Sequence, residues 1–356
     1  MDVALLDQAL DDLLPDWRAL HAADPHATPF TSAGWAQAWW RHWGQGARPW
    51  LLAVHDAETL VGLAPLALAR AGPLRVLRGL GRHPGDYWDV LALPELRERV
   101  VELVGEALLE HAGRWDLLIA NGLPPGSATP GALGEHGCRV ARRPSSPCPA
   151  IDLPDSFDAY LATLSRQHRG NLRRHLRRLD GGEVTLRELR GPEDLEPAIA
   201  RWSELRARQW EVAGRALTPQ QRDPRFTPFV RDVALALVPQ GLAQVRELRT
   251  GGRVVGIYVD FIDGATFYWF LGGFDPEAAA LGLGKIAAGE AIRSSIAAGR
   301  ARFDFAHGAE AYKYWFGARD RPSESLLVGS GRLRSRAALG AARIAGRVRD
   351  GRGAGS

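Results

Sequence analysis

The sequence lacks three features that mark special classes of protein. It has only two cysteines, Cys138 and Cys148, which are too few for a disulfide framework and wrongly spaced for a metal-binding knuckle. No uninterrupted apolar run reaches the roughly 18 residues of a membrane span. The N-terminal segment is acidic and amphipathic, unlike the basic start of a signal peptide. We therefore expect a cytoplasmic protein without a metal or a membrane span.

Lysine is almost absent. Of the 45 basic residues, 43 are arginine, and only Lys285 and Lys313 are lysine. This bias indicates a GC-rich, bacterial type of coding sequence in which arginine supplies any generic positive charge. A position that stays lysine is expected to need a compact ammonium group rather than a planar guanidinium. Chance survival is the alternative, but both lysines lie in the stretch that holds the other candidate site residues.

The excess of positive charge is small and gathers at the C-terminus. The net charge is +4, and residues 331–356 contain seven arginines but only one carboxylate, Asp350. Such a tail could contact nucleic acid or an anionic surface, or it could be a solvated, partly helical or disordered end. The seven are Arg332, Arg334, Arg336, Arg343, Arg347, Arg349 and Arg352.

Length and composition indicate two globular domains. The chain has 356 residues, 46% hydrophobic and 24% charged, which suits a pair of ordinary domains. Residues 123–150 are rich in glycine, proline and serine and form the predicted junction. We expect an N-terminal domain over 1–135, a C-terminal catalytic domain over 136–330 and a basic tail over 331–356.

The hydrophobic pattern of the C-terminal part predicts a meander followed by a helix. Apolar, β-rich runs at 243–248, 254–262 and 266–271 are separated by glycine turns, which is typical of antiparallel strands. A helix over 282–298 and a strand over 302–306 follow. The N-terminal half shows a similar order of strand pair, long helix and strand. We expect an α/β (α+β) fold with two domains, each a mixed, mostly antiparallel sheet flanked by helices.

The start of the predicted helix 282–298 carries the first candidate binding site. Gly282, Gly284 and Lys285 stand where the free N–H groups and the positive dipole end of a helix attract an anion. The stretch is not a P-loop, because Ala279 and Ile286 occupy positions that the P-loop motif reserves for glycine and Ser/Thr. The glycines could also serve only to cap and pack the helix.

The second candidate site follows the predicted strand 302–306 and is rich in polar groups. Alternation along the strand places Asp304 on the face opposite its phenylalanine neighbours. Glu310 and Lys313 are three residues apart and would be neighbours on a short helix. His307 and Tyr312 complete the group. A surface helix with an ion pair would explain the same residues without any catalytic role.

Three phrases in the sequence resemble the GNAT acyltransferase superfamily, in particular its two-domain branch of CelD-like (BioF-type) acetyltransferases. The phrases are Phe30–Trp35, Arg169–Arg174 and Phe303–Lys313, and the resemblance spans about residues 28 to 330. The same arrangement is distantly similar to the Fem aminoacyl-tRNA-dependent transferases. Two positions depart from the GNAT pattern: Ala279 replaces the usual Gln or Arg, and His307 stands where relatives commonly have arginine.

The resemblance implies where a donor would bind. Acyl-CoA would insert between the strands 266–271 and 302–306, with its pyrophosphate on Gly282, Gly284 and Lys285. A backbone N–H near Leu271 or Gly272 would stabilise the oxyanion.

The resemblance also implies one catalytic residue, and the residue pattern itself supplies further catalytic and acceptor-binding candidates. Tyr312 would protonate the departing thiolate. Lys313, Glu310, His307 and Asp304 are the further catalytic candidates. Asp86, Asp89 and Trp269 are the candidates for binding the acceptor, with the two aspartates placed at the domain interface.

The predicted function is N-acyl transfer without a metal. The donor would be acetyl-CoA or another acyl-CoA, and the acceptor an amine of a small molecule, a sugar or a peptide-like compound. The alternative is a Fem-like transferase, whose aminoacyl-tRNA would contact the basic helix 166–178 and the arginine tail. A solvated helix face would explain those arginines equally well, and a structural turn is the simpler explanation of Asp86 and Asp89. A non-catalytic binding module with the same fold is a third possibility.

Overall fold

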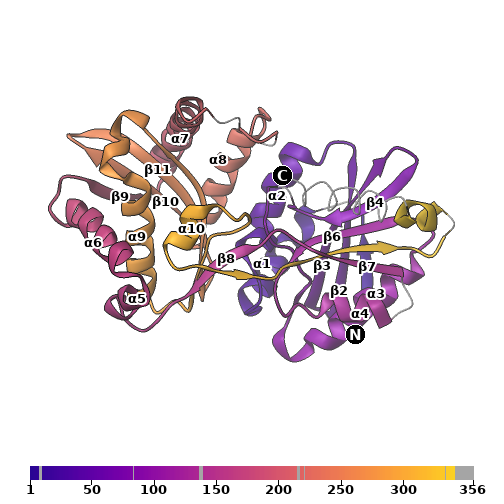
Figure 1. The fold of residues 1–356 in the computed structure, drawn as a ribbon. Helices are drawn as coiled ribbons and strands as arrows, with labels where there is room; N and C mark the ends of the chain where they lie inside the picture. Colours follow the sequence, from indigo (N-terminus) through magenta and orange to yellow (C-terminus); the bar gives the residue numbers. More distant parts are fainter. Residues whose placement is uncertain are drawn as a thin grey trace. The chain divides into compact units, whose positions relative to one another are not determined.

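The chain folds into two compact units (Figure 1). The computed structural model describes residues 1–7, 10–82, 84–135, 139–214, 217–219, 221–332 and 334–340. The first unit comprises Met1–Ser145 and Pro322–Ser356, and the second comprises Ser146–Arg321. The chain therefore first passes from one unit to the other between Ser145 and Ser146, inside the predicted junction segment 123–150.

The first unit is built on one mixed sheet with the strand order β1-β2-β3-β4-β6-β15-β7, in which β5 also pairs with β3. All neighbouring strands are antiparallel except β4 and β6. The strands are β1 (Asp2–Leu6), β2 (Ala47–Asp56), β3 (Thr59–Ala71), β4 (Leu74–Gly79), β5 (Leu91–Ala92), β6 (Leu117–Leu123), β7 (Arg139–Pro144) and β15 (Glu324–Gly329).

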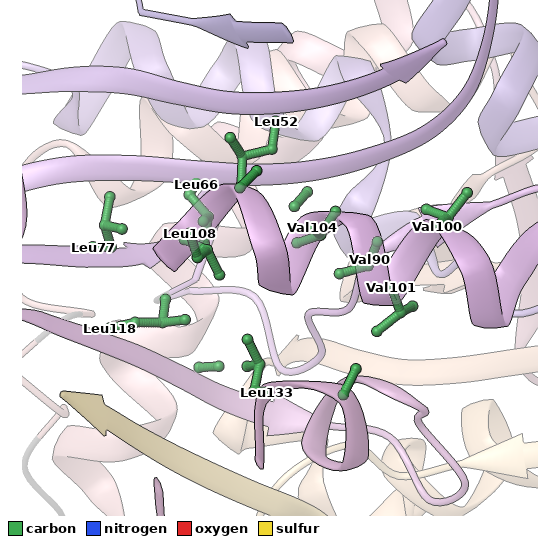
Figure 2. Close-up of a cluster of buried hydrophobic side chains, with 14 of the residues drawn as sticks. Leu52, Leu66, Leu77, Val90, Val100, Val101, Val104, Leu108, Leu118 and Leu133 are labelled. Carbon is green, nitrogen blue, oxygen red and sulfur yellow. The ribbon is translucent and has the colours of Figure 1, made fainter. Parts of the chain in front are cut away.

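Alternation along these strands feeds two hydrophobic cores, one on each face of the sheet. In β2, Leu52 belongs to the core under α3 and α4, whereas Leu51 belongs to the core under α1 and α2. Figure 2 shows Val104 and Leu108 of α3 beside the strand residues Leu52 and Leu66. The helices are α1 (Leu14–Ala23), α2 (Ala33–Trp43), α3 (Arg97–Glu110) and α4 (Thr129–Glu135).

The Phe30–Trp35 phrase has a structural role in the first unit. Ser32 caps α2, because its hydroxyl accepts the Trp35 amide at 3.3 Å. The fully buried Trp35 indole donates to the Gly81 carbonyl at 3.0 Å. Gly81 has φ +84 and a Cβ there would lie 2.6 Å from the indole, so this position needs glycine.

The second unit contains a separate seven-stranded sheet with the order β14-β8-β13-β12-β11-β10-β9. The predicted meander is confirmed as β10, β11 and β12, which pair antiparallel. β12 and β13 are parallel, and β8 lies between β13 and β14. The strands are β8 (Cys148–Asp152), β9 (Thr185–Leu189), β10 (Ala243–Thr250), β11 (Arg253–Ile262), β12 (Thr266–Phe274), β13 (Arg302–Asp304) and β14 (Arg319–Arg321).

Helices flank this second sheet. α6 and α9 lie side by side (Figure 1), and Leu172 of α6 sits 2.6 Å from where a Cβ on Gly289 of α9 would be. None of the helices in the described ranges is long and apolar enough to cross a bilayer. The helices are α5 (Phe157–Thr163), α6 (Arg166–Asp180), α7 (Pro192–Val212), α8 (Phe226–Leu237), η4 (Pro276–Leu281, a 3-10 helix), α9 (Leu283–Ala297) and α10 (Ala311–Trp315).

The predicted fold class is confirmed, but the chain divides differently at its C-terminal end. The expected catalytic domain 136–330 included β15, and the structure instead pairs β15 with β6 and β7 of the first unit. Leu326 and Val328 of this strand are buried in the core under α3. Residues 334–340 of the expected tail are helical, and Leu339 packs against the same unit. Arg343, Arg347, Arg349 and Arg352 lie outside the described residues.

Candidate active site

The strands β12 and β13 separate after a short parallel contact. They pair only at Thr266–Arg302, Phe267–Phe303 and Tyr268–Asp304, while β12 continues to Phe274. β11 pairs with one edge of this continuation. In the described part of the chain, no strand pairs with its other edge. The second half of β12 therefore presents backbone groups at an open edge, as the predicted splay of these strands requires.

Two glycines on β12 allow close approach from both faces. A Cβ on Gly272 would lie 2.7 Å from the Tyr258 ring, and a Cβ on Gly273 would lie 3.0 Å from the backbone of α7. Arg206 of α7 donates to the Gly272 carbonyl at 2.8 Å. The N–H and C=O of one strand residue point to the same side. The Gly272 N–H is therefore on the edge that Arg206 reaches.

Tyr258 of β11 was not predicted, and it is the polar group most closely tied to these glycines. It is 2% exposed, and its hydroxyl has no hydrogen-bond partner in the described part of the chain. Its ring packs against Trp269 at 5.0 Å between centroids, with the ring planes tilted by 35°. The hydroxyl lies 3.9 Å from where a Cβ on Gly284 would be. Burial raises the pKa of Tyr258 well above its usual range, so the hydroxyl stays protonated.

Tyr312 of α10 brings a second hydroxyl to the same place. Its surface is 47% exposed, but its hydroxyl accepts from the Trp269 indole and lies near Arg206 and Asp260. Burial, reinforced by the charge of Glu310, raises the pKa of Tyr312. Burial also lowers the pKa of Arg206 to about 10, which leaves its guanidinium charged at neutral pH. Tyr312 is therefore a persistent hydrogen-bond donor rather than a base.

A buried ion pair fixes the position of Trp269. Arg246 of β10 and Asp260 of β11 are 3% and 0% exposed, and Nη2 of the arginine lies 2.6 Å from Oδ2 of the aspartate. The Arg246 guanidinium also donates to the Ala287 carbonyl of α9 at 3.1 Å and lies 5.6 Å from the Trp269 ring centroid. Burial raises the pKa of Asp260, and Arg246 opposes this rise. The pair ties strands and helix together beneath the site.

Lys313 does not face the open edge of β12. Its side chain is 3% exposed, and its ammonium donates to the carbonyls of Ala306, His307 and Gly308 at 3.3, 2.8 and 3.0 Å. Its Nζ also lies 2.8 Å from a carboxylate oxygen of Glu310. These acceptors use all three ammonium protons. Lys313 therefore holds the loop 304–310 in place and has no proton left for a substrate.

That loop contains strained backbone. Ala306 has φ +57, a conformation that costs an L-residue about 1–2 kcal/mol, and Gly308 has φ +109. Asp304 is 5% exposed and accepts the Ala306 amide at 2.6 Å. His307 Nδ1 lies 3.7 Å from Cys148 Sγ. Asp304 and His307 therefore belong to the loop framework, as does Lys313.

Glu310 is the carboxylate that this framework presents to solvent. It is 57% exposed although it is paired with Lys313. Its charge acts on the Tyr312 hydroxyl. Of the five predicted catalytic residues, Tyr312 and Glu310 are exposed, His307 is half-buried, and Asp304 and Lys313 are buried.

The start of α9 is a cationic surface with glycines. Gly282 has φ +72, and the His175 ring occupies the place that a Cβ would take, 2.4 Å away. Burial lowers the pKa of His175, and Lys285, Arg178 and Arg174 add to this effect. A Cβ on Gly284 would lie 3.9 Å from the Tyr258 hydroxyl, and apart from α9 itself no other described residue would come within 4 Å of it. Gly284 is therefore the open position of the predicted anion site, and Gly282 is covered.

Lys285 of α9 has its ammonium 4.9 Å from the centroid of the Trp315 ring. No ion pair of Lys285 occurs among the described residues. Leu271, also predicted to bind the donor, is 6% exposed in β12. A free cation at the start of a helix is the arrangement that an anionic ligand requires.

The two predicted acceptor aspartates lie in the first unit. Asp89 is 7% exposed, and its carboxylate accepts from the Thr129 hydroxyl at 2.5 Å and from the Val90 amide at 2.9 Å. Burial raises the pKa of Asp89. Asp86 is half-buried, and its backbone carbonyl lies against Gly122. Asp89 therefore has partners within its own unit, which is typical of a structural residue.

A comparison with protein families matches residues 166–314 to the acetyltransferase (GNAT) domain. The match begins at α6 and ends within α10, so it contains the open edge of β12, the start of α9 and Tyr312. No curated protein sequence matches the chain.

Solved structures share the fold of nearly the whole chain. FemX has a TM-score of 0.67 at 11% identity, covering 92% of this chain and 97% of FemX. The C-terminal domain of a proposed lysylphosphatidylglycerol synthetase from Agrobacterium fabrum has a TM-score of 0.59 at 11% identity, with coverage of 94% and 96%. L-PGS from Bacillus licheniformis has a TM-score of 0.51 at 12% identity, with coverage of 80% and 85%. The chain is thus an acyltransferase with a GNAT domain in its second unit, and it shares the fold of FemX over nearly its whole length.

Proposed function

We propose that the second unit transfers an acyl group from acyl-CoA to an amine. The observation that carries the proposal is the convergence of three features around Tyr258 and Trp269. These are the Gly272 edge of β12, the Tyr312 hydroxyl and the open, cationic start of α9 at Gly284. A thioester with a phosphate-bearing tail needs an oxyanion donor, a leaving-group partner and an anion site.

The chemistry follows from these positions. The Gly272 N–H would donate to the thioester oxygen as negative charge develops on it. The amine nitrogen attacks the carbonyl carbon, and the C–S bond breaks with its electron pair on sulfur. The nitrogen loses one proton and the thiolate gains one, so charge balances. Glu310, which is exposed and whose charge acts on Tyr312, would accept the amine proton.

Tyr312 would act on the leaving group as a hydrogen-bond donor. Its pKa is raised above the ordinary tyrosine value, whereas a thiol has a pKa of about 8.5. Complete proton transfer from Tyr312 to the thiolate would therefore be unfavourable. A hydrogen bond from Tyr312 stabilises the developing thiolate without that cost, and solvent or the protonated Glu310 completes the neutralisation.

The donor class is tested by calorimetric titration of the full chain with CoA. Gly284→Asp places bulk and negative charge beside the phosphates, so the affinity should fall by about tenfold or more, which is about 1.4 kcal/mol. Gly264→Asp is the matched control, because Gly264 lies in the β11–β12 turn with open space around it. Equal CoA affinity in both variants would show that the donor does not bind at the start of α9.

An aminoacyl-tRNA donor is the second candidate, and two observations favour it. The fold matches FemX over nearly the whole chain. The arginines Arg166, Arg173 and Arg177 of α6 are exposed. A parallel filter-binding titration with aminoacyl-tRNA separates the donors, because phosphate contacts make RNA binding weaken with salt. Tight tRNA binding without CoA binding would favour this donor over acyl-CoA.

A further inference from the structure

We propose that the first unit binds a phosphomonoester in an arginine-lined cavity at one end of its sheet. The cavity has a volume of about 370 Å³ and is lined by residues that include Arg48, Arg70, Arg75 and Arg114. A space of this size lies within the range of small-molecule sites. The site belongs to the first unit and is independent of the acyl-transfer site proposed for the second.

Two of the arginines stand directly opposite each other. Arg70 of β3 and Arg75 of β4 are register partners, and like charges in that position destabilise a sheet. Arg75 is neutralised by Asp116, which accepts its Nε at 3.1 Å and its Nη2 at 3.0 Å. Arg70 is exposed and has no hydrogen-bond or ionic partner in the described part of the chain. Arg70 is therefore the unbalanced charge of this pair, and an anion in the cavity would balance it.

The other two arginines extend the same cationic wall. Arg114 lies 4.8 Å from the centroid of the Trp50 ring and pairs with Asp7 at 2.5 Å. Arg48 of β2 is exposed and, within the described ranges, has no partner. The guanidinium groups of Arg114 and Arg48 therefore line the cavity from two further segments of the chain.

The charge balance identifies the class of ligand. The four guanidinium groups carry +4, and Asp7 and Asp116 contribute −2, which leaves an excess of +2. A phosphomonoester carries about −1.5 to −2 at neutral pH, and its oxygens match the fork of a guanidinium. A carboxylate would neutralise only half of this excess. The volume leaves room for an organic group beside the phosphate.

The arginine-rich composition alone does not explain this cluster. Three other arginines of the first unit have carboxylate partners: Arg97 pairs with Asp24, Arg99 with Glu102, and Arg142 with Glu324. Arg18 and Arg78 are exposed and have no such partner among the described residues, but neither lines this cavity. Arg48 and Arg70 lack such partners although they face one cavity together. Concentrated, unneutralised positive charge around a concave space is the arrangement that favours anion binding.

The test is the melting temperature of the full chain with ribose 5-phosphate, inorganic phosphate or acetate at matched ionic strength. Ligand binding raises stability by mass action. Ribose 5-phosphate should raise the melting temperature most and acetate least. Arg70→Gln and Arg48→Gln should each weaken the affinity for ribose 5-phosphate by about tenfold.

Arg78→Gln is the matched control. Arg78 is also exposed and lies on β4, but alternation places it on the face opposite Arg75. The control should bind like the wild-type protein. Without ligand, Arg70→Gln should melt no lower than wild type, because it removes a like-charge pair. Equal responses of Arg70→Gln and Arg78→Gln, an equal effect of inorganic phosphate and ribose 5-phosphate, or no response in the wild type would each overturn the proposal.

Discussion

At the scale of single residues, Lys313 shows that the sequence can predict the need for an ammonium group. The sequence does not predict which way that side chain points. The survival of lysine in an arginine-biased chain predicted a need for a compact ammonium, and a buried ammonium surrounded by three carbonyls has that need. A catalytic role of Lys313 would be indirect, through the Glu310 carboxylate that its ammonium contacts at 2.8 Å. The side chain faces the loop 304–310 because α10 is oriented by tertiary contacts.

Lys313→Met should therefore lower stability before it affects chemistry. It leaves buried carbonyls without a donor, and each such group costs about 1–3 kcal/mol. We expect a loss of about 3 kcal/mol in the free energy of unfolding, measured with urea. Lys313→Arg should also destabilise, because a planar guanidinium does not fit the same enclosure. Lys285→Arg is the control and should change stability by less than about 0.5 kcal/mol. An unchanged urea midpoint in Lys313→Met would contradict the loop-holding role.

Tyr312→Phe tests the leaving-group donor. Removing the hydroxyl should lower kcat by about tenfold or more with little change in melting temperature, because the ring remains. The raised pKa of Tyr312 means that its neutral form persists through pH 10, so its ionisation should produce no fall in the wild-type rate below that pH. Tyr314→Phe is the control, since that hydroxyl bonds Asp320. Equal kcat values for the two variants would remove Tyr312 from the chemistry.

At the scale of secondary-structure elements, local sequence patterns predicted individual helices and strands. They did not predict which strands distant in the sequence pair with each other. Periodicity placed the helix 282–298 close to α9, and glycine turns placed the meander β10–β12. The positions of two strands in the sheets could not be predicted, because each strand pairs with partners far away in the sequence. β8 enters the second sheet beside β13, and β15 returns to the first sheet. Tyr258 was not predicted for the same reason, because its place in the candidate site depends on the nearby Gly272 and Gly284, which are distant from it in the sequence.

The buried pair of Arg246 and Asp260 should dominate the stability of the second sheet. Asp260→Ala leaves an uncompensated guanidinium in the core, and such losses amount to about 3–5 kcal/mol. Asp180→Ala breaks a surface ion pair with Arg293; the Asp180 side chain is 51% exposed and the Arg293 side chain 34%. Its loss should lower the free energy of unfolding by about 1 kcal/mol or less. Urea unfolding of both variants measures the difference. Similar losses in the two would show that burial does not set the strength of these pairs.

At the scale of the whole molecule, the two units share a plan but differ in chemistry. Each has one parallel strand pair, β4–β6 in the first and β12–β13 in the second, within an otherwise antiparallel sheet. The acetyltransferase domain matches only the second unit, where the glycines, Tyr258 and Tyr312 converge. In the first unit, the proposed phosphomonoester cavity lies at one end of the sheet. We therefore propose that the acyl-transfer chemistry belongs to the second unit alone.

Hydrogen–deuterium exchange of the full chain with and without CoA tests this assignment most directly. Bound CoA should slow exchange at the start of α9, around Gly284 and Lys285, and at the open edge of β12 near Gly272, because the ligand shields these amides from solvent. The Gly284→Asp variant should lose the protection at both segments. Slowed exchange confined to the first unit, or no change at either segment under saturating CoA, would contradict an acyl-CoA site in the second unit.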